Sequence, residues 1–189
     1  MKNYKTAFFF ISILLISCAS KKTEIQGNGY VQTGKISKNY RVGTWKYFYD
    51  SGELFQKGNF KKSKESGLWK IYHPNGALKQ IGKFKNGNIN GHWKFYHDNG
   101  MLYGTGNAVM GKFDGEWKWF FRNGQIHTVR NYENGRLRNV EFAKNYNGKS
   151  IDKGTIHNGT GSLIIYETEK LKDSIIEKLQ YIEGILVDN

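Results

Sequence analysis

The residues with the clearest potential for chemistry are tryptophans and lysines that recur together along the chain. Four tryptophans are each followed directly by a lysine, and the pair returns every 24 residues: Trp45 and Lys46, Trp69 and Lys70, Trp93 and Lys94, Trp117 and Lys118. A row of indole rings can stack on sugar rings or on a partner's apolar groups, and a row of ammonium groups attracts anions. These eight residues are therefore our candidate binding face.

Each of these two columns also has a purely structural interpretation. The tryptophans can pack against neighbouring structural units, and the lysines can keep a sheet soluble and protect its edges from pairing. The formal net charge of +13 favours an acidic partner, such as an anionic lipid headgroup, a polyanionic glycan or an acidic protein. The sequence alone leaves both interpretations of the two columns open.

Catalytic and metal-binding patterns are weak by comparison. His73 and His97 lie one period apart; with two strands per period they would stand about 10 Å apart, too far for two nitrogens that must each lie about 2.0–2.1 Å from one zinc ion. The acidic residues are scattered over expected turns, and no nucleophile–base set or phosphate-binding glycine motif stands out. We predict no metal, no cofactor and no enzymatic activity.

The columns belong to a repeat of constant length. Gly43 opens one unit, Trp45 follows two residues later, and a third column carries an aromatic residue at Phe48. The next columns hold Gly52 and Leu54, and the unit closes with a glycine and an aromatic residue. The same order returns in three further units, which open at Gly67, Gly91 and Gly115. The pattern departs from this order at Ala108, Arg130, Asn139 and Glu141.

The repeating element is predicted to be a β-hairpin. In His73-Pro74-Asn75-Gly76, proline suits the second position of a type I turn, and glycine supplies the left-handed residue of the bulge that follows. The flanking segments are rich in tryptophan, tyrosine, phenylalanine and isoleucine, as strands are. We expect Tyr72 to pair near Leu78 and Trp69 near Ile81, and we expect a ring from the neighbouring hairpin to cover each strand glycine.

The first residues predict export and anchoring. A basic start and an apolar run over Ala7–Ile16 have the build of a signal peptide and are too short to span a bilayer, which needs roughly 20 residues. Leu15-Ile16-Ser17-Cys18 resembles a bacterial lipobox, which implies cleavage before Cys18 and acylation of its thiol. Cys18 is the only cysteine, so no disulfide is expected. Cleavage would lower the net charge from +13 to +11 by removing two lysines.

The repeat resembles a known family. The order G-x-W-x-x-Y-x-x-N-G-x-L-x-x-x-G-x-F-x-N-G, read from Gly67 to Gly87, is similar to the variant MORN repeat. Bacterial proteins with this repeat are often labelled antitoxin components of toxin–antitoxin systems. The resemblance implies an elongated, single-layer sheet that binds partners. It extends well over 30–156 and loosely as far as Gly184.

Three segments follow from these patterns: a signal peptide over 1–17, a tether over 18–27 and a hairpin array over 28–189. Units are well formed over 43–138 and degenerate at both ends. Within 170–186, Leu171, Ile175, Leu179 and Ile182 have helical spacing, whereas the repeat frame predicts strands and a turn at Glu183-Gly184. We favour the strands.

The function we expect is that of an all-β, lipid-anchored scaffold in the cell envelope, held by acylated Cys18 to the outer membrane rather than the inner, that binds a protein partner. The alternatives are an antitoxin that caps a toxin and an envelope protein that binds glycans. Nucleic acid is not expected as a partner, because an exported protein would meet none.

Overall fold

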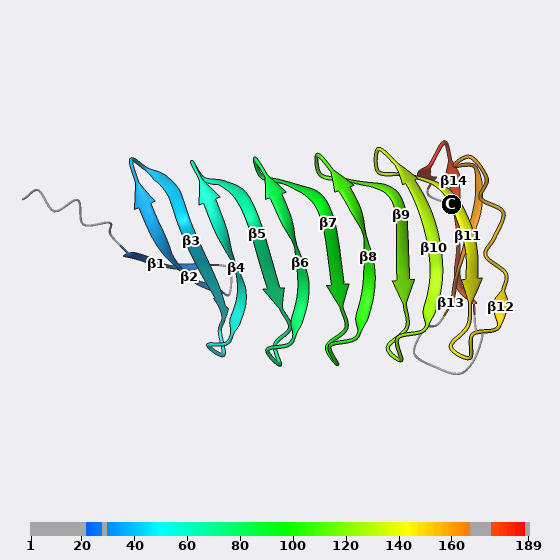
Figure 1. The fold of residues 1–189 in the computed structure, drawn as a ribbon, viewed down its shortest axis with the longest axis horizontal. Coiled ribbons are helices and arrows are strands. Elements are labelled where there is room, and N and C mark those ends of the chain that lie inside the picture. Colours follow the sequence, from blue (N-terminus) through cyan, green and yellow to red (C-terminus); the bar gives the residue numbers. More distant parts are fainter. Residues whose placement is uncertain (1–21, 28–29, 167–174, 188–189) are drawn as a thin grey trace, which may run out of the picture.

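The computed structural model describes residues 22–27, 30–166 and 175–187, and within these ranges the chain forms strands and no helix. Twelve strands make one sheet in sequence order, each antiparallel to the next, and three more make a second sheet (Figure 1). The predicted all-β meander of hairpins is confirmed. No helix in the described part of the chain is long and apolar enough to cross a membrane.

The first sheet consists of β1 (Lys22–Gly27), β2 (Tyr30–Ser37), β3 (Tyr40–Tyr49), β4 (Leu54–Lys61), β5 (Lys64–Tyr72), β6 (Leu78–Lys85), β7 (Asn88–Tyr96), β8 (Leu102–Val109), β9 (Lys112–Phe120), β10 (Ile126–Glu133), β11 (Arg136–Lys144) and β12 (Ser150–Ile151). The second sheet consists of β13 (Gly161–Tyr166), β14 (Ile175–Ile182) and β15 (Ile185–Val187). The ribbon in Figure 1 shows the first sheet as an elongated row of successive hairpins.

The turn within each unit has the predicted form. The amide of Gly76 donates a hydrogen bond to the carbonyl oxygen of His73 (2.9 Å), and the amide of His73 donates to that of Ala77 (2.8 Å). Gly76 has a φ of 82°, the left-handed value that closes this loop and that residues other than glycine rarely adopt. The Asn75 side chain strengthens the turn by accepting the amide of Ala77 at 3.0 Å.

A second kind of turn joins one unit to the next. Asn86 and Gly87 both have positive φ, 54° and 86°, which matches the two-residue turn that suits the twist of an antiparallel hairpin. The amide of Gly87 also donates to the carbonyl oxygen of Glu65, one unit earlier (3.0 Å). The turn at Met110-Gly111 repeats this bond to Ile89. Successive units are therefore tied along this edge as well as through their strands.

Packing between units depends on glycine. The ring of Trp69, on β5, lies over Gly58 on β4 so closely that a Cβ built on that glycine would stand 2.0 Å from the ring. The same arrangement holds for Trp45 over Gly34, Trp93 over Gly82 and Trp117 over Gly106, with distances of 2.1–2.3 Å. The expected cover of a strand glycine by a ring of the neighbouring hairpin is confirmed for this column. It does not hold for the strand glycines that open the units, which have nothing within 4 Å of a built Cβ: Gly43, Gly67, Gly91 and Gly115.

The strand register differs from our expectation by one residue. Tyr72 pairs with Leu78 as predicted, but Trp69 pairs with Gly82 instead of Ile81. A β-bulge between Ile71 and Tyr72 causes the shift, because one strand carries an extra residue at that point. Since a shift of one residue moves a side chain to the other face, the bulge puts Trp69 on the same face as Gly82.

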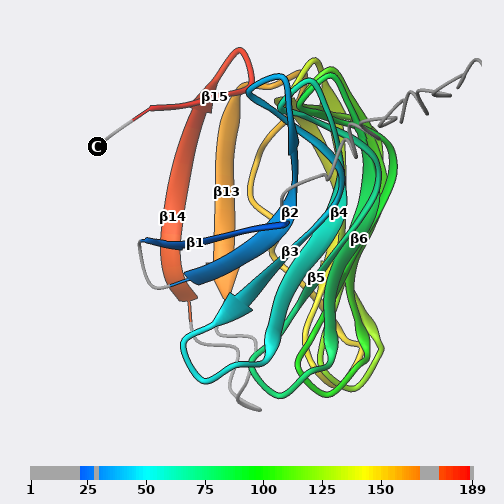
Figure 2. The ribbon, with the colours of Figure 1, turned by 90° about the vertical axis from the view of Figure 1, so that its left-hand side faces the viewer.

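The C-terminal end departs from the expected single layer. There β13 and β14 lie on the concave side of the main sheet, to its left in Figure 2. Leu137 and Val140 of β11 pack with Ile156 and with Leu163 of β13 in one buried cluster. Where Asn139 and Glu141 interrupt the repeat, a second layer therefore covers the sheet, as the apolar face of a terminal unit requires.

Two further expectations concern the ends of the chain. Lys22–Gly27, part of the segment expected to be a tether, forms β1 and pairs with β2. Near the C-terminus, Ile175–Ile182 and Ile185–Val187 are strands, and Glu183-Gly184 is a turn with φ of 51° and 80°. The favoured strand interpretation is confirmed there and the helical alternative is wrong, while residues 167–174 lie outside the described part.

Candidate binding surfaces

The four predicted tryptophans do not form an exposed ladder. Trp45, Trp69, Trp93 and Trp117 are 0%, 3%, 2% and 0% exposed, because each lies over a glycine and between aromatic neighbours. Phe60, for example, meets Trp69 edge-on with ring centroids 5.2 Å apart. The expectation that these rings belong to a binding surface is wrong. The structural interpretation of the tryptophan column holds.

The predicted face also combined residues that point in opposite directions. Consecutive residues of a strand point to opposite faces, so Trp69 and Lys70 cannot share one surface. We call the side that carries Trp45, Trp69, Trp93 and Trp117 the tryptophan face, and the side that carries Lys46, Lys70, Lys94 and Lys118 the lysine face. The candidate surface is therefore split between the two sides of the sheet.

On the lysine face the lysines line up across the strands. Lys46 pairs with Lys57, and Lys57 pairs with Lys70, so that three lysines stand directly opposite one another on β3, β4 and β5. The row continues through Ile81, Lys94, Thr105 and Lys118 to β9. Lys57 was missed from the sequence because it belongs to no repeated column. We call Lys46, Lys57, Lys70, Lys94 and Lys118 the lysine row.

Few acids neutralise this row. Among the described residues Lys118 forms an ion pair with Glu116 (3.0 Å), and that pair is solvent-exposed. The ammonium of Lys57 lies over the ring of Tyr72, 5.8 Å from its centroid. Like charges directly opposite each other on adjacent strands are destabilising, so we expect the repulsion among Lys46, Lys57 and Lys70 to lower the stability of the sheet.

His73 and His97 connect successive units. The Nε2 atom of His73 lies 2.9 Å from the carbonyl oxygen of Tyr96, and that of His97 lies 3.1 Å from the carbonyl oxygen of Phe120. A carbonyl oxygen only accepts, so Nε2 carries the proton and donates in both. Tyr49, in the same column, donates its hydroxyl to the carbonyl oxygen of Tyr72 (2.8 Å). No cluster of three histidine, cysteine, aspartate or glutamate side chains suited to a metal occurs in the part described.

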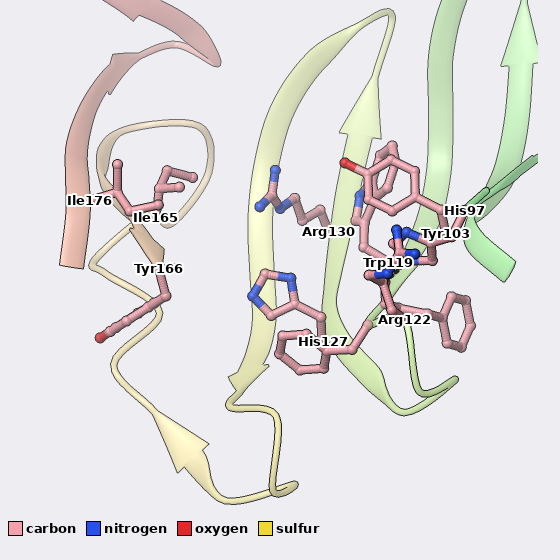
Figure 3. Close-up of a pocket in the computed structure, with 11 residues that line it drawn as sticks. His97, Tyr103, Trp119, Arg122, His127, Arg130, Ile165, Tyr166 and Ile176 are labelled. Atoms are coloured by element: carbon pink, nitrogen blue, oxygen red, sulfur yellow. Dashed lines mark hydrogen bonds between the residues drawn. The ribbon is translucent and has the colours of Figure 1, made fainter. Parts of the chain in front are cut away.

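A cavity of about 390 Å³ lies at the C-terminal end of the tryptophan face. Trp119 of β9 and Arg130 of β10 line one side, while Ile165 of β13 and Ile176 of β14 line the other (Figure 3). His127 lies beside Arg130, and burial together with the positive charge of Arg130 lowers the pKa of His127 to about 4. From the sequence, Arg130 was notable only because it replaces a glycine of the repeat. In the fold its charged side chain lines a cavity.

Cys18, the predicted lipidation site, lies outside the described residues. Its acylation, and the membrane attachment and envelope location that depend on it, remain predictions from the sequence.

The fold and the surfaces together define a class of protein: a repeat array that offers an extended binding surface. Four stretches match the family described as the MORN repeat variant, at residues 41–62, 65–86, 89–108 and 113–134. These matches coincide with the four hairpin units opened by Gly43, Gly67, Gly91 and Gly115. No curated protein matches the chain.

Proposed function

We propose that this protein is a membrane-anchored, non-catalytic scaffold of the cell envelope that binds an acidic protein along its lysine face. The lysine row supports this proposal most directly. It places five ammonium groups across seven strands, from β3 to β9. At about 4.8 Å per strand the row is roughly 30 Å long, a length suited to a protein surface rather than to one small molecule.

The close pairing of Lys46, Lys57 and Lys70 strengthens the argument. Directly opposed like charges work against the sheet in the free protein, whereas an acidic partner would relieve their repulsion on binding. Electrostatic complementarity of this kind chiefly raises association rates and sets specificity. The partner is therefore expected to present carboxylates along a matching line.

Of the two alternative functions, one is compatible with this proposal and the other has lost its main support. An antitoxin role would be a special case, in which the acidic partner is a toxin, and deletion of the protein would then harm cells only while the toxin gene is intact. Glycan binding drew its support from the four tryptophan rings, which are covered. We therefore retain the first alternative and set the second aside.

The scaffold is tested by site-specific photo-crosslinking in cells. A benzophenone amino acid replaces Thr44, an exposed residue two positions from Lys46 on the same face, or Met110, an exposed turn residue that serves as the control site. We expect one dominant crosslinked protein of low isoelectric point from position 44 and none from position 110.

Removing charges at chosen positions then distinguishes binding by the lysine row from nonspecific attraction to the positive protein as a whole. The triple change Lys46→Gln, Lys57→Gln and Lys70→Gln should abolish the adduct. The matched change Lys62→Gln, Lys85→Gln and Lys112→Gln, at exposed lysines in or beside turns, should leave it intact. Survival of the adduct in the first variant, or its loss in both, would rule out the row as the binding surface.

The anchor needs its own test. Cells fed labelled palmitate should incorporate the label into the wild-type protein and not into Cys18→Ala, which should leave the membrane fraction. A Cys18→Ala protein that stays on membranes would refute the lipid anchor and leave the crosslinking result unaffected.

A further inference from the structure

The cavity at the C-terminal end of the tryptophan face holds donors without an acceptor among the described residues. The Nε atom of Arg130 and the indole Nε1 atom of Trp119 are both buried, and within residues 22–27, 30–166 and 175–187 neither has a hydrogen-bond partner. Elsewhere on the tryptophan face the indole of Trp117 donates to the carbonyl oxygen of Asn107 at 2.8 Å, and that of Trp69 donates to the carbonyl oxygen of Asn59 at 3.2 Å. The indole of Trp93, outside the cavity, likewise has no partner among the described residues, so what sets the cavity apart is that two such donors line it together. A buried donor without an acceptor is destabilising by about 1–3 kcal/mol and calls for an explanation.

The cations around these donors are Arg122 and Arg130, and none of the described lining residues is acidic. His127 also lines the cavity and, with a pKa of about 4, is neutral near pH 7. Arg122 is already paired with Asp98 outside the lining, at 2.5 Å. None of the three ion pairs formed within the described residues includes Arg130. Burial is the main cause of the low pKa of His127, and the positive charge of Arg130 lowers that pKa further, so Arg130 is the charged group of this pair.

The rest of the wall is apolar or aromatic. Tyr103 packs against Trp119 with ring centroids 5.3 Å apart, and Phe121 packs against His127 at 4.6 Å. Ile165 and Ile176 line the opposite side, from the second sheet, and Ile176 stays 64% exposed at the mouth (Figure 3). The volume of about 390 Å³ falls within the range of small-molecule sites, which are largely apolar and carry a few placed polar groups.

We infer that this cavity is a binding site for a small aromatic carboxylate, whose negative group accepts hydrogen bonds from Arg130 and Trp119 and whose ring lies among the aromatic and isoleucine side chains. A charge-assisted hydrogen bond to a guanidinium is about twice as strong as a neutral one, so Arg130 carries most of the selectivity for an anion. The site is separate from the lysine row and lies on the opposite face of the sheet.

Calorimetric titration of the full-length protein tests the site, with 2-naphthoate as the probe and 2-naphthamide as its neutral counterpart. We expect saturable binding of one naphthoate, and an affinity for the amide that is about tenfold lower or weaker still. The indole N–H resonance of Trp119, assigned by its loss in Trp119→Phe, should shift with naphthoate.

Three variants give the matched comparisons. Arg130→Gln should weaken naphthoate binding by about tenfold or more, and Arg130→Lys should restore part of that loss because it keeps the charge. Lys83→Gln, which removes a cation on β6 outside the cavity lining and outside the lysine row, should bind like the wild type. Absence of saturable binding, equal binding of amide and acid, or an unchanged affinity in Arg130→Gln would each overturn the inference.

A last variant tests whether a carboxylate side chain of the protein itself occupies the cavity. Glu167, Glu169 and Asp173 follow Tyr166 in the sequence and lie outside the described residues. If naphthoate bound only after these three were changed to Gln, Gln and Asn, the cavity would be a site for a carboxylate of the chain itself, and the inference would be wrong. Equal binding with and without these changes supports a site for a separate molecule.

Discussion

At the scale of single residues, glycine has two distinct roles in each unit. Gly82 has no room for a side chain, because a Cβ there would stand 2.1 Å from the ring of Trp93. Gly76 has open space around it and a φ of 82°, so its requirement is conformational. One column lets two hairpins approach each other, and the other closes a single hairpin.

This difference predicts a coupling between Gly82 and Trp93. Gly82→Ala should lower the free energy of unfolding by about 2–3 kcal/mol, because the added methyl displaces the ring. In a Trp93→Leu background the same change should lower it by less than about 1 kcal/mol, since the ring is gone. Urea denaturation of the four proteins measures both values.

Gly76→Ala is the control for that cycle. Gly76→Ala lowers the free energy of unfolding through backbone strain at positive φ, so the decrease should be the same with and without the Trp93 ring. Additive losses for Gly82→Ala and Trp93→Leu would contradict the packing account.

The partnership of glycine and tryptophan was predictable from the sequence, because both recur in fixed columns and a bare Cα in a strand implies a close neighbour. The indole donor of Trp119 and the cation of Arg130 were not predictable as a pair. They lie on different strands, and only the position of the second sheet, which has no repeated counterpart, makes a cavity of their surroundings.

At the scale of the strand, alternation and bulges decide which residues share a surface. Trp69 and Lys70 are neighbours in sequence and lie on opposite faces, whereas Lys46, Lys57 and Lys70 are far apart in sequence and adjacent in space. The turns could be predicted because asparagine, proline and glycine specify them locally. The lysine row could not be predicted, because its register depends on a one-residue β-bulge, and no residue type at that position identifies the bulge from the sequence.

The lysine row predicts that removing one charge stabilises the free protein. Lys57→Gln should raise the free energy of unfolding by about 0.3–0.5 kcal/mol at low salt, because Lys57 faces a lysine on each side. At about 1 M salt the gain should vanish, since charges farther apart than about 3 Å are then screened. Urea denaturation of the wild type and Lys57→Gln at the two salt concentrations measures both changes in the free energy of unfolding.

Lys83→Gln is the matched control, because Lys83 stands opposite Leu68 and Asn90, which are uncharged. It should change stability little at either salt concentration. If Lys57→Gln instead destabilised the protein equally at both, the contact of Lys57 with the Tyr72 ring would outweigh the repulsion.

At the scale of the whole molecule, the second sheet turns a uniform array into one with two different ends. Toward the N-terminus the main sheet continues as paired strands to β1 (Figure 1), and toward the C-terminus β13 and β14 lie over its concave side (Figure 2). His127 and Arg130 lie beneath this cover, next to Ile165 and Ile176. Added positive charge at His127 would therefore act directly on the docking of the two sheets.

Acid should weaken this docking. The pKa of His127 is lowered from 6.5 to about 4, so between these values the unfolded chain binds a proton that the folded chain does not. Stability is then fully present above pH 6.5 and falls as the pH is lowered toward 4, by roughly 3 kcal/mol at about 1.4 kcal/mol per pH unit.

Thermal unfolding between pH 7 and pH 4 measures this loss, and His127→Gln should remove most of it. Hydrogen exchange should place the early opening in β13 and β14. Equal pH dependence in the wild type and His127→Gln would assign the effect to other groups.

The position of the cavity at one extremity has an evolutionary consequence. Duplicating or deleting an internal unit would change the reach of the molecule by roughly 10 Å each time, while the geometry around Arg130 stayed as it was. Gene length could thus change the length of the array, and point mutations near the last hairpins could change the inferred site around Arg130, so that natural selection can adjust the two traits independently.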